Sequence, residues 1–317
     1  MPAILTEHSI LHSPAAMRLA VSRALRPAEE LLAACAFPPA GQCLDLAVSG
    51  GPDSVALSVL TAMAGVRGSI WHVDHGLRST SGEEAAAVEE FAAALGMPFH
   101  LVRDEVPTGP NLEARARELR RDRIPGGAAT GHTMDDQAET VLINLARGAG
   151  PRGLAAMRPG PSKPLLGIRR ADTEAVCAAL GLTPIRDPSN QSSDFVRNRV
   201  RHELLPLLGE ITRRDPVPIL ARSAQVFREE DDHLDLEASR IDAGDASALG
   251  GAPRPLRMRA LRQAVSAISG YPPDRTSLER LDALILGGGR FRLQLAGGVE
   301  VCAVRGRIEY RRIEPPL

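Results

Sequence analysis

Short apolar runs alternate with helical patterns between Cys43 and Arg147, and this alternation limits the possible folds more than any other feature. Apolar runs at 43–48, 69–73, 98–102 and 128–131 predict strands, and helical spacing follows at 54–64, 83–95, 112–123 and 135–147. Strands that alternate with helices indicate a parallel sheet covered on both faces. We therefore expect an α/β fold with a doubly wound, mostly parallel sheet.

The length of 317 residues favours two domains. The first residues have no clear pattern, and helical spacing appears at 16–35. Later segments predict a charged helix at 218–238, a Gly/Ala-rich linker at 243–253 and a closing β section at 290–312. We expect a flexible tail at 1–16, an α/β domain at 17–208 and a smaller α+β domain at 209–317.

Composition excludes several classes of protein. The four cysteines form no C-x-x-C pair, which argues against a zinc ribbon, a redox motif or a cysteine-bound iron–sulfur cluster. No apolar run has the length of a membrane span, and no secretion signal is evident, so we expect a cytoplasmic protein without a membrane partner. The net charge of -1 means that a nucleic-acid partner would need a local basic patch.

The hexapeptide SGGPDS, residues 49–54, joins the first predicted strand to its helix. Glycines here let the backbone approach phosphate oxygens, and the helix start adds free N–H groups and a positive dipole end. Asp53 fits either a helix N-cap or a ligand of a divalent cation beside phosphate. We expect a nucleotide phosphate site, without a Walker A lysine, formed by Ser49, Gly50, Gly51, Pro52, Asp53 and Ser54.

Two further turns follow predicted strands, HVDHGLR at 72–78 and TGHTMDDQAET at 130–140. In parallel sheets, ligands bind at the carboxyl ends of the strands. Helical spacing places Glu139 on one face with Asp135 or with Asp136, which predicts a group of carboxylates near the phosphate site. The alternative is structural, because Thr133 and Asp136 also fit a variant of the capping box.

Four motifs in this order resemble the PP-loop ATP pyrophosphatase family, and within it the tRNA(Ile)-lysidine synthase branch. They are SGGPDS, HVDHGLR, TGHTMDDQAETVLINLARGAGPRGL and DPSNQSSDFVRNRVRHELLPLL, and the resemblance covers about Leu46 to Leu208. It implies a five-stranded, adenine-nucleotide α-hydrolase-like sheet and the use of ATP with Mg²⁺. It also implies that L-lysine is joined to C2 of the wobble cytidine of an isoleucine tRNA through an adenylated cytosine, releasing AMP and pyrophosphate.

The resemblance implies roles for individual residues. His72 and Asp74 would border the nucleotide, and Asp53 would hold Mg²⁺. Asp135, Asp136 and Glu139 would hold the lysine. Arg197 and Arg201 share a helical face and would bind phosphate or the transition state. The expected catalytic set is Asp53, Asp136, Glu139, Arg197 and Arg201, and the expected tRNA contacts are Arg78, Arg117, Arg120 and Arg121, for which a solvated basic surface is the alternative.

Two other functions stay open at this point. Another PP-loop tRNA-modifying enzyme or amide ligase fits as well, because the loop predicts only that ATP gives AMP and pyrophosphate. A non-catalytic nucleotide-sensing or RNA-binding module would keep the loop but would not need carboxylates near it. A monomer and a homodimer are both compatible with the sequence.

Overall fold

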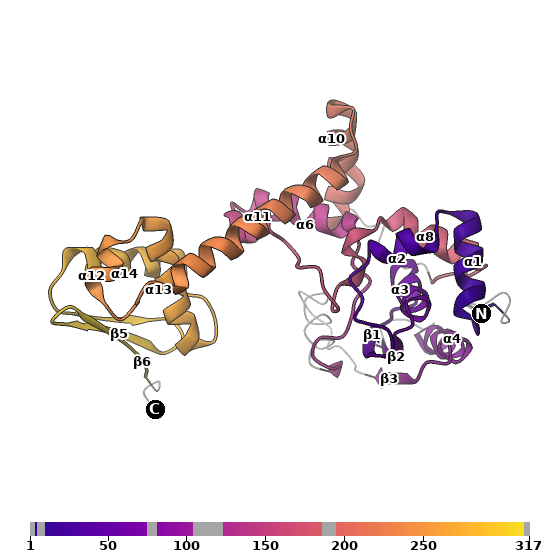
Figure 1. Ribbon diagram of the computed structural model, residues 1–317, viewed down its shortest axis with the longest axis horizontal. Coiled ribbons are helices and arrows are strands. Elements are labelled where there is room, and N and C mark those ends of the chain that lie inside the picture. Colours follow the sequence, from indigo (N-terminus) through magenta and orange to yellow (C-terminus); the bar gives the residue numbers. More distant parts are fainter. Residues whose placement is uncertain (1–3, 5–9, 75–80, 104–122, 186–194, 314–317) are drawn as a thin grey trace. The chain divides into compact units, whose positions relative to one another are not determined.

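The computed structural model describes residues 4, 10–74, 81–103, 123–185 and 195–313, which belong to two compact units (Figure 1). The first unit is Met1–Ala224 and the second is Gln225–Leu317. Helix α11 (Pro216–Ser239) begins in the first unit and ends in the second. No helix in the described part of the chain combines the length and the apolar character that a membrane crossing requires.

A parallel sheet of three strands, β1 (Cys43–Ala47), β2 (Arg67–Asp74) and β3 (Phe99–Arg103), forms the centre of the first unit. The strand order is β1-β2-β3, with Leu46 paired to Ile70 and Ile70 to Phe99. Helices α3 (Pro52–Met63) and α4 (Ser81–Ala94) connect the strands. The strands predicted at 43–48, 69–73 and 98–102 and their parallel arrangement are confirmed.

The chain then returns to the other edge of β1. Ala129 bridges Leu46 in parallel, and its backbone is hydrogen-bonded to Ala47 (2.9 Å) and Asp45 (2.7 Å). The strand predicted at 128–131 is therefore reduced to one bridge, since the chain turns away after Ala129. The described residues thus contain three parallel strands and this bridge, not five strands, and most of the helix predicted at 112–123 lies outside them.

The N-terminal segment differs from its prediction in two ways. Ile4 and Leu11 lie in the stretch expected to be a tail. Both are buried, because their apolar side chains pack into the core of the first unit. The helical pattern at 16–35 forms two helices, α1 (Pro14–Ala24) and α2 (Ala28–Ala33). Pro27 separates them, since proline has no N–H to continue the first helix.

The remaining helices of the first unit place side chains at the carboxyl edge of the sheet. Helix α8 packs against α3, and an apolar cluster with Ala138 and Val200 at its centre packs α6 against η3, α10 and the start of α11. These elements are α6 (Met134–Ala146), α7 (Pro151–Leu154), η1 (Pro164–Gly167), α8 (Arg170–Ala179), α9 (Val196–Arg199), the π-helical turn η3 (Val200–Leu204) and α10 (Leu205–Thr212).

The second unit has its own core, centred on residues such as Leu261 and Leu281. Its antiparallel sheet has the order β4-β5-β6, which confirms the β section predicted at 290–312. The expected linker at 243–253 contains a short helix, α12, because the Asp245 side chain accepts a hydrogen bond from the Ser247 N–H (2.8 Å) and caps it. The elements are α12 (Ala246–Gly251), α13 (Arg254–Ser269), α14 (Arg275–Gly287), β4 (Phe291–Leu295), β5 (Val299–Val304) and β6 (Arg307–Arg312).

Candidate active site

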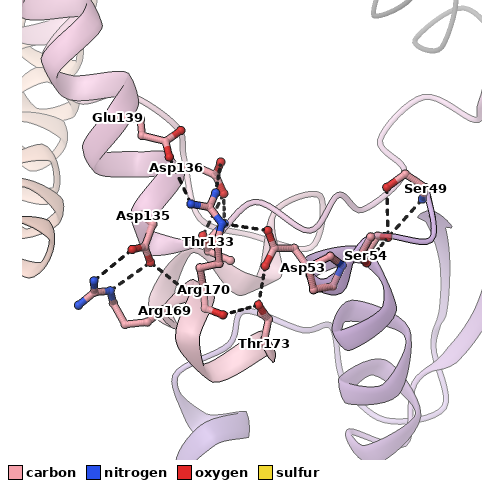
Figure 2. A network of polar contacts seen from close by, with 12 residues as sticks. Ser49, Asp53, Ser54, Thr133, Asp135, Asp136, Glu139, Arg169, Arg170 and Thr173 are labelled. Atoms are coloured by element: carbon pink, nitrogen blue, oxygen red, sulfur yellow. Dashed lines mark hydrogen bonds and ion pairs between the residues drawn. The ribbon is translucent and has the colours of Figure 1, made fainter. Parts of the chain in front are cut away.

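The SGGPDS loop is a tight turn between β1 and α3. Gly50 has φ +84°, a backbone conformation that glycine adopts without strain, and its carbonyl accepts a hydrogen bond from the Ile185 N–H (2.9 Å). The Ser54 hydroxyl donates to the Gly51 carbonyl (2.9 Å). It also accepts from the Ser49 N–H (3.2 Å), as Figure 2 shows. The loop thus gathers two hydroxyl groups at the N-terminus of α3, where backbone N–H groups and the helix dipole favour an anion.

The loop lies where the chain changes direction across the sheet. From β1 the chain moves to β2 and β3 on one side, and at Ala129 it returns on the other side. Such a switch point is where open α/β sheets bind ligands. A side chain at Gly131 would bring its Cβ within 2.7 Å of the Asp53 backbone, so the turn after Ala129 packs directly against the start of α3.

Asp136 and Glu139, both on α6, face the same two arginines. The Arg170 guanidinium contacts Asp136 (3.0 Å) and Glu139 (3.3 Å). Arg197 of α9 contacts the same carboxylates at 2.9 and 2.6 Å. Glu139 is only 1% exposed and Asp136 only 8%, so these ion pairs compensate two buried negative charges.

Asp53 joins the loop to this group of carboxylates. One carboxylate oxygen of Asp53 accepts a hydrogen bond from the Thr173 hydroxyl, and the other accepts from Arg170 Nε at 3.3 Å. Arg170 therefore lies between Asp53, Asp136 and Glu139, as Figure 2 shows. We call these residues, together with Arg197 and Thr173, the carboxylate network. The predicted proximity of the acidic residues to the loop is thus present in the structure.

The two oxygens of Asp136 serve different purposes. Oδ2 accepts hydrogen bonds from the Thr133 N–H (2.8 Å) and the Thr133 hydroxyl (2.9 Å), which confirms the capping interaction at the start of α6. Oδ1 faces Arg170 and Arg197. The structural and the functional interpretations of Asp136 are therefore compatible, because each uses its own oxygen.

Asp135 pairs with a different arginine. Its carboxylate accepts two hydrogen bonds from Arg169 (both 3.1 Å) and one from the Arg170 N–H (2.8 Å), at the first residue of α8. Burial opposes ionisation of Asp135, but Arg169 and the Arg170 N–H outweigh it and lower its pKa. Asp135 thus stabilises the start of α8 and so helps to position Arg170, the first residue of that helix.

The pKa values of the two aspartates that contact the Arg170 side chain are shifted in opposite directions. Burial acts to raise the pKa of Asp136, but Arg170 and Arg197 outweigh it, and the pKa lies below the ordinary value. Burial also dominates at Asp53, where Arg170 and Thr173 compensate only in part, so its pKa is raised. The Arg170 pKa is raised by the three carboxylates despite the opposing effect of burial, so Arg170 stays a cation.

Arg169, Arg170 and Thr173 were missed by the sequence interpretation. One signal was available, since Arg169 and Arg170 stand at the start of a helical pattern. Cations are unfavourable at that end of a helix unless acidic groups compensate them. A pair of arginines there therefore pointed to carboxylates nearby.

The structure places some of the other predicted residues and leaves several outside the described part. His72 is buried at the end of β2, and its Nδ1 lies 2.8 Å from the Val48 carbonyl oxygen, directly before the SGGPDS loop. Asp74 is the last residue of β2, and Arg201 lies in η3, not bonded to the carboxylates of the network. Among the predicted site residues, four lie outside the described ranges: Arg78, Arg117, Arg120 and Arg121.

The fold and the loop define the class of this protein: residues 24–208 match the PP-loop domain family, to which the chain belongs. Curated relatives narrow the class. A tRNA(Ile)-lysidine synthase from Nocardia farcinica is 38% identical over 302 residues, which cover 87% of this chain and 94% of the relative. Proteins of the same name match from Mycolicibacterium paratuberculosis (42%; 68% and 72% covered) and Thermobifida fusca (37%; 85% and 87% covered).

The chain is therefore a member of the tRNA(Ile)-lysidine synthase family of enzymes, as its motifs predict. Among solved structures, the U34-tRNA thiolase NcsA from Methanococcus maripaludis is similar at 18% identity and a TM-score of 0.46, with 68% of this chain and 78% of that chain covered.

Proposed function

We propose that this protein joins L-lysine to C2 of the wobble cytidine of an isoleucine tRNA at the expense of ATP. In the first step the cytosine O2 attacks the α phosphate of ATP and pyrophosphate leaves. In the second step a lysine amine attacks C2, the bond from C2 to the adenylated oxygen breaks, and AMP leaves as a proton is lost from the amine. The observation that carries the proposal is the carboxylate network, which connects the nucleotide loop to buried acidic groups.

The first step needs donors for the departing pyrophosphate. Ser49, Gly50, Gly51, Pro52 and Ser54 form the turn proposed to hold it, with the N-terminus of α3 behind them. His72 and Asp74 end the neighbouring strand and are proposed to border the nucleotide. The turn is anchored through Gly50 and Ile185, so it is shaped before a ligand arrives.

Asp53 fits Mg²⁺ in its chemistry. Each of its carboxylate oxygens accepts one hydrogen bond, from Thr173 or Arg170, and so keeps a further lone pair for a hard cation. Among the described residues no three acidic, histidine or cysteine side chains form a metal site, so phosphate oxygens and water would complete the coordination. Mg²⁺ bound there would neutralise charge that develops on the phosphates.

Asp136 and Glu139 are proposed to hold the cationic lysine, with Asp135 at the rim. Two arginines already neutralise these carboxylates, and they differ in exposure: the Arg170 side chain is 13% exposed and that of Arg197 is 28% exposed. We propose that the ammonium group of lysine replaces Arg197 at the carboxylates, because Arg197 is the more accessible cation. Arg197, released from its acidic partners, would then bind phosphate oxygens of the nucleotide, and Arg201, which no carboxylate of the network holds, would bind a phosphate of either substrate.

The finer points of organisation are also proposals. We propose a five-stranded, doubly wound sheet, a catalytic domain at 17–208 and tRNA binding by residues 209–317. Arg78, Arg117, Arg120 and Arg121 are proposed as contacts to the tRNA backbone, where binding is electrostatic. We place the protein in the cytoplasm, where tRNA substrates are processed, as a monomer or a homodimer.

The decisive test uses purified protein, ATP, labelled lysine and tRNA transcripts that differ only at the wobble base. We expect label on the transcript with a wobble cytidine and stoichiometric AMP. Label on no transcript would refute lysine transfer, and label on every transcript would refute the choice of cytidine. Transfer of another group with the same ATP products would favour a different PP-loop ligase.

A further inference from the structure

An open pocket of about 460 Å³ adjoins the carboxylate network within the first unit. Its walls come from α6, α8, η3, α10 and the start of α11. Asp135 and Glu139 line one wall, so the pocket is continuous with the site proposed to hold lysine. The volume lies in the range of about 300–1,000 Å³ that small-molecule sites occupy.

Three charged side chains on the pocket wall stand apart from the paired ones, Asp135, Glu139, Arg169, Arg170 and Asp215. Glu174 lies one turn after Arg170 on α8, Arg201 lies in η3, and Arg214 follows α10. Within the described ranges, none of these three side chains has an ion pair or a hydrogen bond, whereas Asp135 and Glu139 on the same wall are fully paired. Two arginines and one carboxylate are therefore available to a ligand.

The backbone that carries Arg201 is also unusual. Residues Val200–Leu204 form a π-helical turn, in which the Leu205 N–H donates to the Val200 carbonyl. Pro206 follows and has no N–H for the helix, which favours this wider turn. Single π turns inside helices are frequent at functional sites. Here the turn places Arg201 on the pocket wall beside the apolar residues Leu205 and Pro206.

These groups match the parts of one nucleotide. Two arginines suit a phosphate, which they bind through charged hydrogen bonds. A carboxylate suits the exocyclic amino group of cytosine, which donates, and repels the O4 acceptor that uracil presents at the same position. Apolar side chains suit the face of a base, and bases in single-stranded RNA loops are commonly splayed into such pockets.

We propose that this pocket receives the target cytidine of the RNA, with Arg201 and Arg214 on its phosphate and Glu174 on its amino group. The inference rests on the proposed function and adds to it the residues that read the base. A cytidine in this pocket lies beside the wall formed by Asp135 and Glu139, where the lysine is proposed to bind. Both partners of the second step would then meet in one cavity.

The phosphate contact is tested by the salt dependence of tRNA binding to the full chain. Arg214→Gln should weaken binding of the transcript with a wobble cytidine about tenfold and lower the steepness of the salt dependence by about one ion. Arg213→Gln is the matched control, because Arg213 is exposed, adjacent and outside the pocket lining. Equal behaviour of the two variants would overturn the phosphate contact.

Base recognition is tested by the ratio of dissociation constants for transcripts with cytidine or uridine at the wobble position. The wild-type protein should favour cytidine, and Glu174→Gln should reduce that preference about tenfold because the glutamine amide can also donate to uracil. Glu210→Gln, at an exposed residue away from the pocket lining, should keep the preference. An unchanged preference in Glu174→Gln would overturn the inference.

Failure of the proposed function gives a different result. If the wild-type protein transfers lysine to no transcript, the proposed reaction is wrong and the pocket inference falls with it. If the wild-type protein transfers lysine and both pocket variants match their controls, only the pocket inference is wrong. Glu174 and Arg214 are exposed, so neither substitution removes a buried contact that the fold needs.

Discussion

Three carboxylates from two elements share the guanidinium of Arg170. A guanidinium presents several donors in a plane and stays charged, so it can bridge Asp53, Asp136 and Glu139 where a lysine ammonium would not reach all three. The geometry of the acidic groups therefore depends on one side chain at the first turn of α8. Removing it would leave buried negative charges with Arg197 alone.

Arg170→Met should destabilise the first unit by about 3–5 kcal/mol, because breaking a buried ion pair leaves uncompensated charge. The lysine transfer rate should fall with it, and the loss should persist at temperatures where the variant is folded. Denaturant unfolding and a transfer assay measure the two effects. Arg199→Gln removes an exposed ion pair with Glu203, which solvent screens, and we expect no measurable change in stability. Similar losses in both variants would contradict the special position of Arg170.

The free energy of unfolding of the first unit should depend on pH through the carboxyl group of Asp136. Its pKa is depressed in the folded state, so its contribution is complete above the unfolded value of about 3.9 and is lost as the pH falls through the lower folded pKa. The free energy of unfolding should therefore decrease on acidification below about pH 4. Asp136→Asn should flatten this decrease, as measured by urea titrations at several pH values. An equally steep decrease in the variant would exclude Asp136 as a source.

At the scale of elements, the three parallel strands were predictable and the arginine partners of the acidic side chains were not. Each strand of the sheet is a local apolar run with a helical pattern after it, so spacing along the chain contains the information. Arg170 is 117 positions from Asp53, and Arg197 is 61 positions from Asp136. Such pairs form only because α8 packs against α3 and because α6 packs near α9 and η3. Residue spacing could place the acidic side chains on α6 but could not identify their partners.

The contact between the turn at Gly131 and the start of α3 gives a prediction for these two elements. Gly131→Ala would press a methyl group against the Asp53 backbone, which a rigid helix start cannot avoid. We expect a loss of about 1–3 kcal/mol in stability and weaker ATP binding, measured by unfolding and by calorimetric titration. Gly126→Ala is the control, since a Cβ there meets no atom within 4 Å. Normal ATP affinity in Gly131→Ala would contradict the claim that this turn shapes the nucleotide site.

At the scale of the whole molecule, each of the two units has its own apolar core. Chains with separate cores need not unfold in one step, and a substitution in one core then affects one transition. This organisation is compatible with our proposal that the first unit carries out the reaction and that the second unit binds tRNA. The family match ends at residue 208, before the second unit begins.

Leu281→Ala should lower the stability of the second unit by about 2–5 kcal/mol, because Leu281 is fully buried in that core. ATP binding should be unchanged while tRNA affinity falls, as measured by calorimetric titration and filter binding. Leu286→Ala, on the same helix but 53% exposed, should leave the ATP and tRNA affinities unchanged. Weaker ATP binding in Leu281→Ala would show that the two units do not act separately.

The measurement that tests the central claim most directly is AMP release by Glu139→Gln in the presence of ATP, lysine and tRNA, because AMP leaves in the step in which lysine reacts. Glutamine keeps the shape of the side chain but removes the charge proposed to hold the lysine. We expect kcat/KM for lysine to fall by at least about 100-fold, the loss expected when a buried charged contact to a substrate is removed, while the dissociation constant of ATP stays within about twofold. A Glu139→Gln enzyme that uses lysine as well as the wild type would contradict the assignment of the buried carboxylates to the amino acid.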